Sequence, residues 1–73
     1  MNANRLKIWI DSLTDDIEFS FNGKHGAIMP FNRSNISLGY DGEVTDVTSV
    51  EAAMSTPFIE GKNLNEIAEQ LEF

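Results

Sequence analysis

The stretch that decides the fold is ISLGYDGEVTDV, residues 36–47. Large apolar residues stand at every second position of its first half, which predicts a strand with one apolar face. Asp41-Gly42 then strongly favours a two-residue hairpin turn, so residues 43–47 return as the next strand. This turn fixes which residues lie opposite each other: Val47 and Ile36, Thr45 and Leu38, Val44 and Gly39.

The residues before this hairpin also predict β-structure. Ile17, Phe19 and Phe21 alternate with polar residues, which indicates a strand with one apolar face. Asn22-Gly23 would suit a two-residue turn, but that turn would place Lys24 and Gly26 opposite the phenylalanines. We therefore predict a longer loop over residues 22–26. It brings three apolar side chains onto the same face as the phenylalanines, those of Ala27, Met29 and Phe31.

Two further features of the first half concern its ends. Pro30 predicts that its strand lies at an edge of the sheet or ends early. Residues 6–11 alternate as well, with Leu6, Ile8 and Ile10 on one face, and predict an N-terminal strand. We expect residues 1–4 to be flexible and residues 13–16 to form a polar turn.

Trp9 lies on the opposite face of that predicted N-terminal strand. If the strand is central, Trp9 is covered, which we favour because large aromatic side chains are highly buried on average. If Trp9 is partly exposed instead, it becomes a candidate interface residue, because tryptophan is enriched at binding hot spots.

The second half of the chain predicts helices. Thr48-Ser49-Val50-Glu51 fits a capping box, and the helix that follows ends before Pro57 at about residue 55. After a turn at residues 60–62, Asn63 caps a last helix with Glu66 three residues on. Its apolar stripe consists of Leu64, Ile67, Ala68 and Leu71.

These elements predict an α+β fold in one small domain of residues 1–73. An antiparallel sheet of about four strands is followed by one short and one longer C-terminal helix, both packed on one face of the sheet. A chain of this size has marginal stability, which makes a partner or an oligomer relevant.

The charge of the chain is unevenly distributed. Five basic and 12 acidic residues give a net charge of −7, and residues 1–34 carry four of each sign. The whole excess therefore falls in residues 35–73, where Lys62 is the single basic residue. This balance disfavours contact with phosphate backbones and anionic lipid, so we expect no direct nucleic-acid or membrane binding. We expect a cytoplasmic protein, because the N-terminal residues lack the apolar core of a signal peptide.

The sequence shows no convincing catalytic or metal-binding pattern. There is no cysteine, and His25 is the single histidine. A general base needs a positioned partner and a pocket, and neither can be identified around the predicted loop that holds His25. The acids from Asp41 to Asp46 lack the spacing of a calcium loop. We expect no enzyme, no cofactor and no metal; a small enzyme or ligand-binding protein built on the His25 loop is one alternative.

The closing segment TPFIEGKNLNEI, residues 56–67, combines an apolar pair, Gly-Lys, a cap residue and the opening of a final helix. It resembles the ends of small uncharacterised bacterial proteins, some of which are carried on mobile elements. The resemblance covers about twelve residues and implies a small accessory or regulatory protein rather than a metabolic enzyme.

We therefore expect a non-enzymatic acidic module that binds another protein or a second copy of itself. The residues expected to contact the partner are Trp9, Glu51, Glu60, Glu66 and Glu69. A second alternative is an inhibitor that mimics nucleic acid and occupies the groove of a basic DNA-binding enzyme. It would need these glutamates, together with Glu72, to form a row like that of phosphates.

Overall fold

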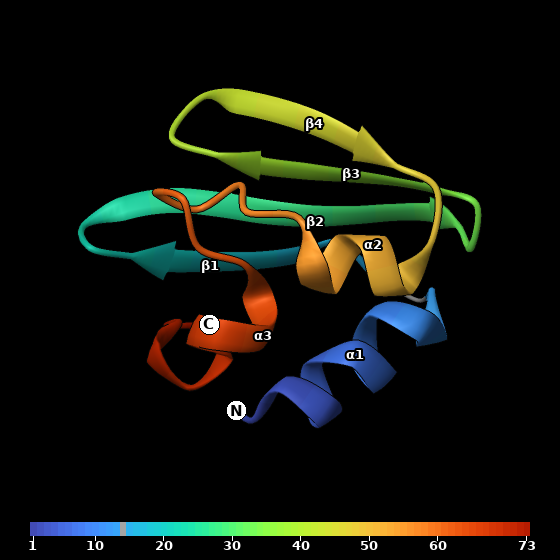
Figure 1. The fold of residues 1–73 in the computed structure, drawn as a ribbon, viewed down its shortest axis with the longest axis horizontal. Coiled ribbons are helices and arrows are strands. Elements are labelled where there is room, and N and C mark those ends of the chain that lie inside the picture. The colour runs from blue at the N-terminus through green and yellow to red at the C-terminus, as the bar shows by residue number, and fades with distance from the viewer. Residues whose placement is uncertain (14) are drawn as a thin grey trace.

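The computed structural model describes residues 1–13 and 15–73, and Figure 1 shows a four-stranded sheet with all helices on one side. The strands follow one another in the sheet as β1-β2-β3-β4, and every neighbouring pair is antiparallel. This arrangement confirms the predicted α+β class. In chain order the elements are α1 (Ala3–Ser12), β1 (Ile17–Phe21), β2 (Lys24–Asn32), β3 (Asn35–Tyr40), β4 (Glu43–Val47), α2 (Val50–Ser55), α3 (Leu64–Ile67) and the 3₁₀ turn η1 (Ala68–Gln70).

The hydrophobic core lies between the helices and one face of the sheet. Phe19, Ile28 and Leu38 supply its sheet side, and Leu6 of α1 and Ala53 of α2 belong to the helix side. All four residues of the predicted C-terminal stripe are buried: Leu64, Ile67, Ala68 and Leu71. No helix in the described ranges is long and apolar enough to cross a membrane.

The β3–β4 hairpin has the predicted turn and register. Asp41 and Gly42 have φ angles of 52° and 85°, the positive values that a type I′ turn requires. The three predicted pairs are all observed, with Ile36 opposite Val47 at the far end. Local turn chemistry was sufficient here because the two-residue loop leaves no freedom in the register.

The predicted loop over residues 22–26 is wrong. Asn22 and Gly23 form a two-residue turn, and Phe19 lies opposite Gly26. The ring of Phe19 lies across Gly26, so that a Cβ added there would overlap the ring. The apolar face therefore has no gap, because an aromatic ring covers the glycine that was expected to interrupt it.

This register sends the residues that were expected on the core face to the other face, and places Ile28 in the core instead. Ala27 and Met29 lie on the face of the sheet away from the helices, contrary to prediction, and Phe31 is exposed. Pro30 lies beyond the last β1–β2 pair, so β2 is an edge strand at that point, as its proline predicted. The β2–β3 register shifts just after it.

The predicted strand over residues 6–11 is wrong, because this segment is helix α1. Asn2 caps the helix by accepting a hydrogen bond from the backbone N–H of Arg5 at 2.8 Å, and Leu13 ends it in a left-handed conformation. Leu6 and Ile10 are four residues apart and fully buried, whereas Ile8 is 63% exposed. The strand interpretation needed Ile8 on the buried face, and a helix turns it to solvent.

The two short C-terminal helices follow the predicted order with differences at their ends. Ser49, not Thr48, caps α2, and its hydroxyl accepts from the backbone N–H of Ala52 at 2.9 Å. Asn63 and Glu66 form the predicted capping box of α3. That helix is shorter than predicted, because the chain tightens into η1 at Ala68 and is extended at Leu71.

We predict that Gly26→Ala lowers the free energy of unfolding by about 1–3 kcal/mol, because the new methyl group displaces the Phe19 ring. Gly39→Ala is the matched control in the neighbouring strand, where the nearest atom to an added Cβ is 3.6 Å away. Urea denaturation of both variants measures the difference. Equal losses would contradict the observed β1–β2 register.

We also predict that Ser49→Ala lowers the free energy of unfolding by about 1 kcal/mol, the usual effect of losing an N-cap hydroxyl. Thr48→Ala, one residue earlier, removes no cap and should change stability much less. Thermal or urea unfolding of the two variants would decide which residue caps α2, and a larger loss for Thr48→Ala would restore the predicted cap.

Candidate functional site

The structure places the five expected contact residues on separate elements. Trp9 lies in α1 and Glu51 in α2, Glu60 forms the turn between α2 and α3, and the last two follow in α3 and η1. These glutamates are the ones a nucleic-acid mimic would have to align in a row. The following contacts show what each of them does instead within the chain.

Glu51 and Glu66 both take part in local interactions. Glu51 lies 3.6 Å from the ammonium group of Lys7, which links α2 to α1 across an exposed surface. Glu66 accepts a hydrogen bond from the backbone N–H of Asn63 at 3.2 Å in the capping box. An exposed ion pair of this kind contributes little to stability, whereas a helix cap contributes about 1 kcal/mol.

Glu60 joins the turn after α2 to the sheet. Its carboxylate accepts a hydrogen bond from the Tyr40 hydroxyl at 2.6 Å and two longer ones from the Asn22 amide at 3.3 Å. The Tyr40 hydroxyl oxygen also lies 2.8 Å from the backbone carbonyl oxygen of Phe21, a second acceptor for its single proton. The Asn22-Gly23 turn, the end of β3 and the Glu60-Gly61 turn are therefore held together at one point.

The two ionisable groups in this junction have shifted pKa values. Burial raises the pKa of Tyr40 to about 12, with the hydrogen bond to Glu60 as the next cause. The hydrogen bond from Tyr40, followed by that from Asn22, lowers the pKa of the Glu60 carboxyl. The raised pKa of Tyr40 and the lowered pKa of Glu60 both favour a protonated tyrosine beside an ionised glutamate. This is the effect of a hydrogen bond that the tyrosine donates to the carboxylate.

Glu69 and Glu72 differ from the other glutamates. Neither side chain takes part in an ion pair within the described residues. The backbone of Glu72 pairs with Ser20 through two hydrogen bonds, at 2.7 and 2.9 Å, and so adds a bridge along the outer edge of β1. The C-terminal segment thus shields one edge of the sheet.

His25 lies on a strand rather than in a loop. It is exposed on β2, and its Nε2 lies 3.4 Å from a carboxylate oxygen of Glu18 on β1. Within residues 1–13 and 15–73, no three side chains of the metal-ligating types come together as a metal site requires. The pair borders an open hollow of about 360 Å³, lined by Glu18, Phe19, Ser20, His25, Glu72 and Phe73.

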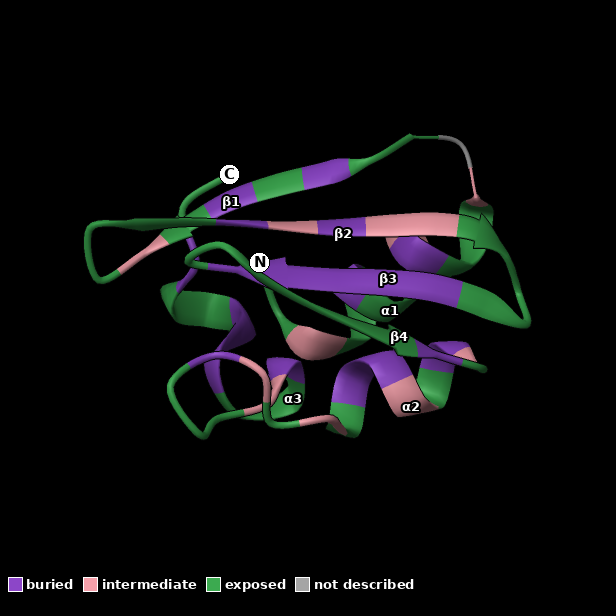
Figure 2. Ribbon diagram, turned by 90° about the horizontal axis from the view of Figure 1, so that it is seen from above, coloured by how far each residue is buried: buried purple, intermediate pink, exposed green. Residues whose placement is uncertain are grey.

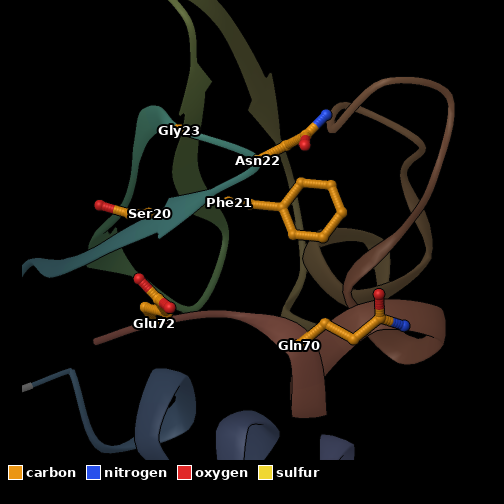
Figure 3. Close-up of a pocket in the computed structure, with 6 residues that line it drawn as sticks. All are labelled: Ser20, Phe21, Asn22, Gly23, Gln70 and Glu72. Carbon is orange, nitrogen blue, oxygen red and sulfur yellow. The ribbon is translucent and has the colours of Figure 1, made fainter.

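A hollow of about 660 Å³ lies between the Asn22-Gly23 turn and the C-terminal segment (Figure 3). Figure 3 shows the Phe21 ring projecting toward the segment that bears Gln70. Glu72 is the one ionisable side chain in its lining. A single carboxylate provides no pair of titratable groups for acid–base chemistry. The lining consists of Ser20, Phe21, Asn22, Gly23, Gln70 and Glu72.

Trp9 belongs to an apolar surface that we call the α1 patch, defined by Met1, Ile8, Trp9 and Phe73. Trp9 is half-buried against the core, and the centroid of its ring lies 5.6 Å from that of Phe73. The other three members are exposed. A shallow hollow of about 340 Å³ lies on this patch, with Arg5 at its rim. The favoured interpretation, a covered Trp9 on a central strand, is wrong, because Trp9 lies on a helix and is only half-buried, as in the second interpretation.

Sequence analysis identified Trp9 but missed Ile8 and Phe73. Ile8 was assigned to a buried strand face, and its exposure could have been found by testing a helical period over residues 3–13. No signal in the sequence brings Phe73 to Trp9, since 64 residues separate them. No protein-family model, curated protein or solved structure matches the chain.

We predict a specific loss of stability in alkali because of Tyr40. Its pKa is higher in the folded chain than in the unfolded chain, so the unfolded state loses a proton first as pH rises. The stabilisation is complete below pH 10 and is lost between pH 10 and about 12. Wild type should therefore lose more stability over this range than Tyr40→Phe, as measured by urea unfolding. Parallel curves for the two proteins would contradict the raised pKa.

Proposed function

We propose that this chain is a non-enzymatic protein-interaction module that works as a dimer, with two copies joined through the α1 patch. The observation that supports the proposal is the gathering of large exposed apolar side chains around the half-buried Trp9. Exposed patches of this kind mark association surfaces more often than single exposed residues do. Tryptophan at the centre of the patch is the residue type most enriched among binding hot spots.

The outward face of α1 suits a second copy of the same helix. Arg5, Ile8 and Ser12 are all exposed and lie three and four residues apart, so they share one stripe of the helix. A two-fold interface is self-complementary, and its axis would pass between Ile8 and Trp9. The helices then run antiparallel, with Ile8 of each copy against Trp9 of the other.

Charge complementarity favours this antiparallel arrangement. Arg5 lies in the first turn of α1 and forms no ion pair within the described residues. The last turn of α1 contains no basic residue of its own, and Arg33 of the β2–β3 turn contacts it through the Asp11 carboxylate at 3.0 Å and the Asp11 carbonyl at 3.4 Å. In the antiparallel dimer Arg5 of one copy lies at that end of the other. The exposed Asp15 and Asp16 follow there.

The glutamates support the mimic alternative less well than the α1 patch supports association. Glu51, Glu60 and Glu66 all contact groups within the chain, and these groups come from α1, β3 and the cap of α3. A nucleic-acid mimic instead needs carboxylates that are free to meet a basic groove. The excess charge in the second half is then a soluble surface that keeps the module dispersed.

We predict that wild-type protein dimerises reversibly, and that Ile8→Ser weakens the dimer about tenfold or more, because the interface no longer buries an isoleucine side chain. Sedimentation equilibrium over a wide concentration range measures this constant. The matched control is Val44→Ser on β4, since Ile8 and Val44 are 63% and 64% exposed and lie on different layers. The Val44→Ser variant should dimerise like wild type.

Three outcomes would contradict the proposal. The first is a strictly monomeric wild type at high concentration. The second is equal weakening by Ile8→Ser and Val44→Ser. The third is an Arg5→Glu variant that dimerises as well as wild type at low salt, since the antiparallel arrangement brings that side chain near Asp15 and Asp16 of the other copy.

A further inference from the structure

The outer side of β4 is an open edge of the sheet. Because β4 ends the strand order, it pairs with β3 alone. Four of its five residues are exposed, and Figure 2 shows this strand as mostly exposed beside β3, which is mostly buried. At the other edge, the bridge between Ser20 and Glu72 covers part of β1. The edge of β4 lacks such a cover within the described residues.

The hairpin geometry fixes which backbone groups face outward. In a two-residue hairpin, the residues flanking the turn, here Tyr40 and Glu43, form a hydrogen-bonded pair. Bonded and non-bonded pairs alternate along the ladder, so Thr45 and Val47 also bond to β3. The N–H and C=O groups of Val44 and Asp46 therefore point away from the sheet, where an added strand would meet them.

The side chains along this edge combine one apolar residue with acids. Val44 and Asp46 lie on the face of the sheet away from the helices, and Val44 is strongly exposed. Glu43 and Asp46 have no basic partner within the described residues. Asp46 accepts a hydrogen bond from the Ser37 hydroxyl at 2.5 Å and so is held in place on that face.

A second copy of this chain is a poor occupant of the edge. Two β4 strands side by side would bring two copies of Glu43 and two of Asp46 onto one narrow ribbon without a cation. Four carboxylates on two adjacent strands with no cation among them repel one another, and this repulsion disfavours the pair. A basic segment meets the same carboxylates with the opposite sign, so charge complementarity selects an extended basic partner.

We propose that the edge of β4 binds an extended basic segment of another protein as a fifth, antiparallel strand. Backbone hydrogen bonds to Val44 and Asp46 hold the segment, and contacts between its side chains and those of β4 give the specificity. In chain order the segment has a basic residue opposite Asp46, a β-branched residue opposite Thr45, an apolar residue opposite Val44 and a basic residue opposite Glu43. Lys-Thr-Val-Lys is the simplest sequence that meets these four requirements.

The same features have a second explanation that the experiment must separate. Natural sheets place charged residues on edge strands to prevent edge-to-edge aggregation. If the acids of β4 only block strand pairing, then neither a basic nor an acidic strand binds there. If they select a partner, then a basic strand binds and an acidic strand of the same length does not.

The experiment titrates isotope-labelled protein with a capped peptide containing Lys-Thr-Val-Lys and follows the backbone amides by NMR at low salt. We expect the amides of Val44 and Asp46 to shift most and to become protected from hydrogen exchange. A peptide containing Glu-Thr-Val-Glu should not bind. In a further peptide, the backbone amide that would donate to the carbonyl of Val44 is methylated. This peptide should bind much more weakly, because it lacks that hydrogen-bond donor. The protein itself is unaltered in this comparison.

Two charge-reversal variants test the position of the contact. Glu43→Lys should weaken binding of the basic peptide about threefold or more, since it places like charges opposite each other. Glu69→Lys changes the net charge equally at an exposed site on η1 and should have a much smaller effect. Val44→Pro removes the outward N–H at an edge position that tolerates proline, and it should abolish binding if the variant folds.

The proposal is overturned if no amide of β4 shifts at saturating peptide, if both peptides bind equally, or if the two lysine variants weaken binding equally. It is independent of the α1 dimer, because α1 and β4 lie at opposite ends of the molecule in Figure 1. Ile8→Ser should therefore bind the basic peptide like wild type. Failure of one proposal leaves the other standing.

Discussion

The contact that organises this molecule is the meeting of two aromatic rings over Gly26. This glycine lies between Phe19 and Tyr40 in one row across the sheet. The two rings are nearly parallel, with an interplanar angle of 8° and centroids 6.4 Å apart, and they approach over a residue that has no side chain. Any side chain at this position would separate them.

The consequences of this contact extend through Tyr40. With its ring against Phe19, the Tyr40 hydroxyl reaches the carboxylate of Glu60 and the carbonyl of Phe21. The turn that holds Glu60 connects α2 to α3, so the same contact places the C-terminal helices over the sheet. The register of the β1–β2 hairpin and the position of the C-terminal helices therefore depend on the same contact.

The sequence predicted those elements whose geometry is set locally. The Asp41-Gly42 turn determined the β3–β4 register, and the Asn63–Glu66 capping box determined the start of α3. It did not predict α1, because six residues with apolar side chains at alternate positions fit a strand almost as well as a helix. Packing decided between them: α1 packs against α2, α3 and β2, Leu6 and Ile10 are fully buried there, and Ile8 remains 63% exposed.

The candidate site was less predictable than the fold for a related reason. Residue type drew attention to Trp9 and to the glutamates, but their roles depend on partners far away in the chain. Lys7 lies 44 residues before Glu51, and Asn22 lies 38 residues before Glu60. A charge count cannot show that such acids are already engaged, since it contains no information on long-range pairs.

The layered arrangement also explains why the two proposed surfaces can coexist. The helices cover one face of the sheet, so the outer side of α1 and the outer edge of β4 are separated by the core itself (Figures 1 and 2). Their chemistries differ accordingly: the α1 patch is apolar with a basic rim, and the β4 edge offers backbone groups and carboxylates. An apolar interface depends weakly on ionic strength, whereas attraction between an acidic edge and a basic strand is screened by salt. A dimer joined at α1 would present two such edges, and binding at both would gain from the raised effective concentration of the second contact.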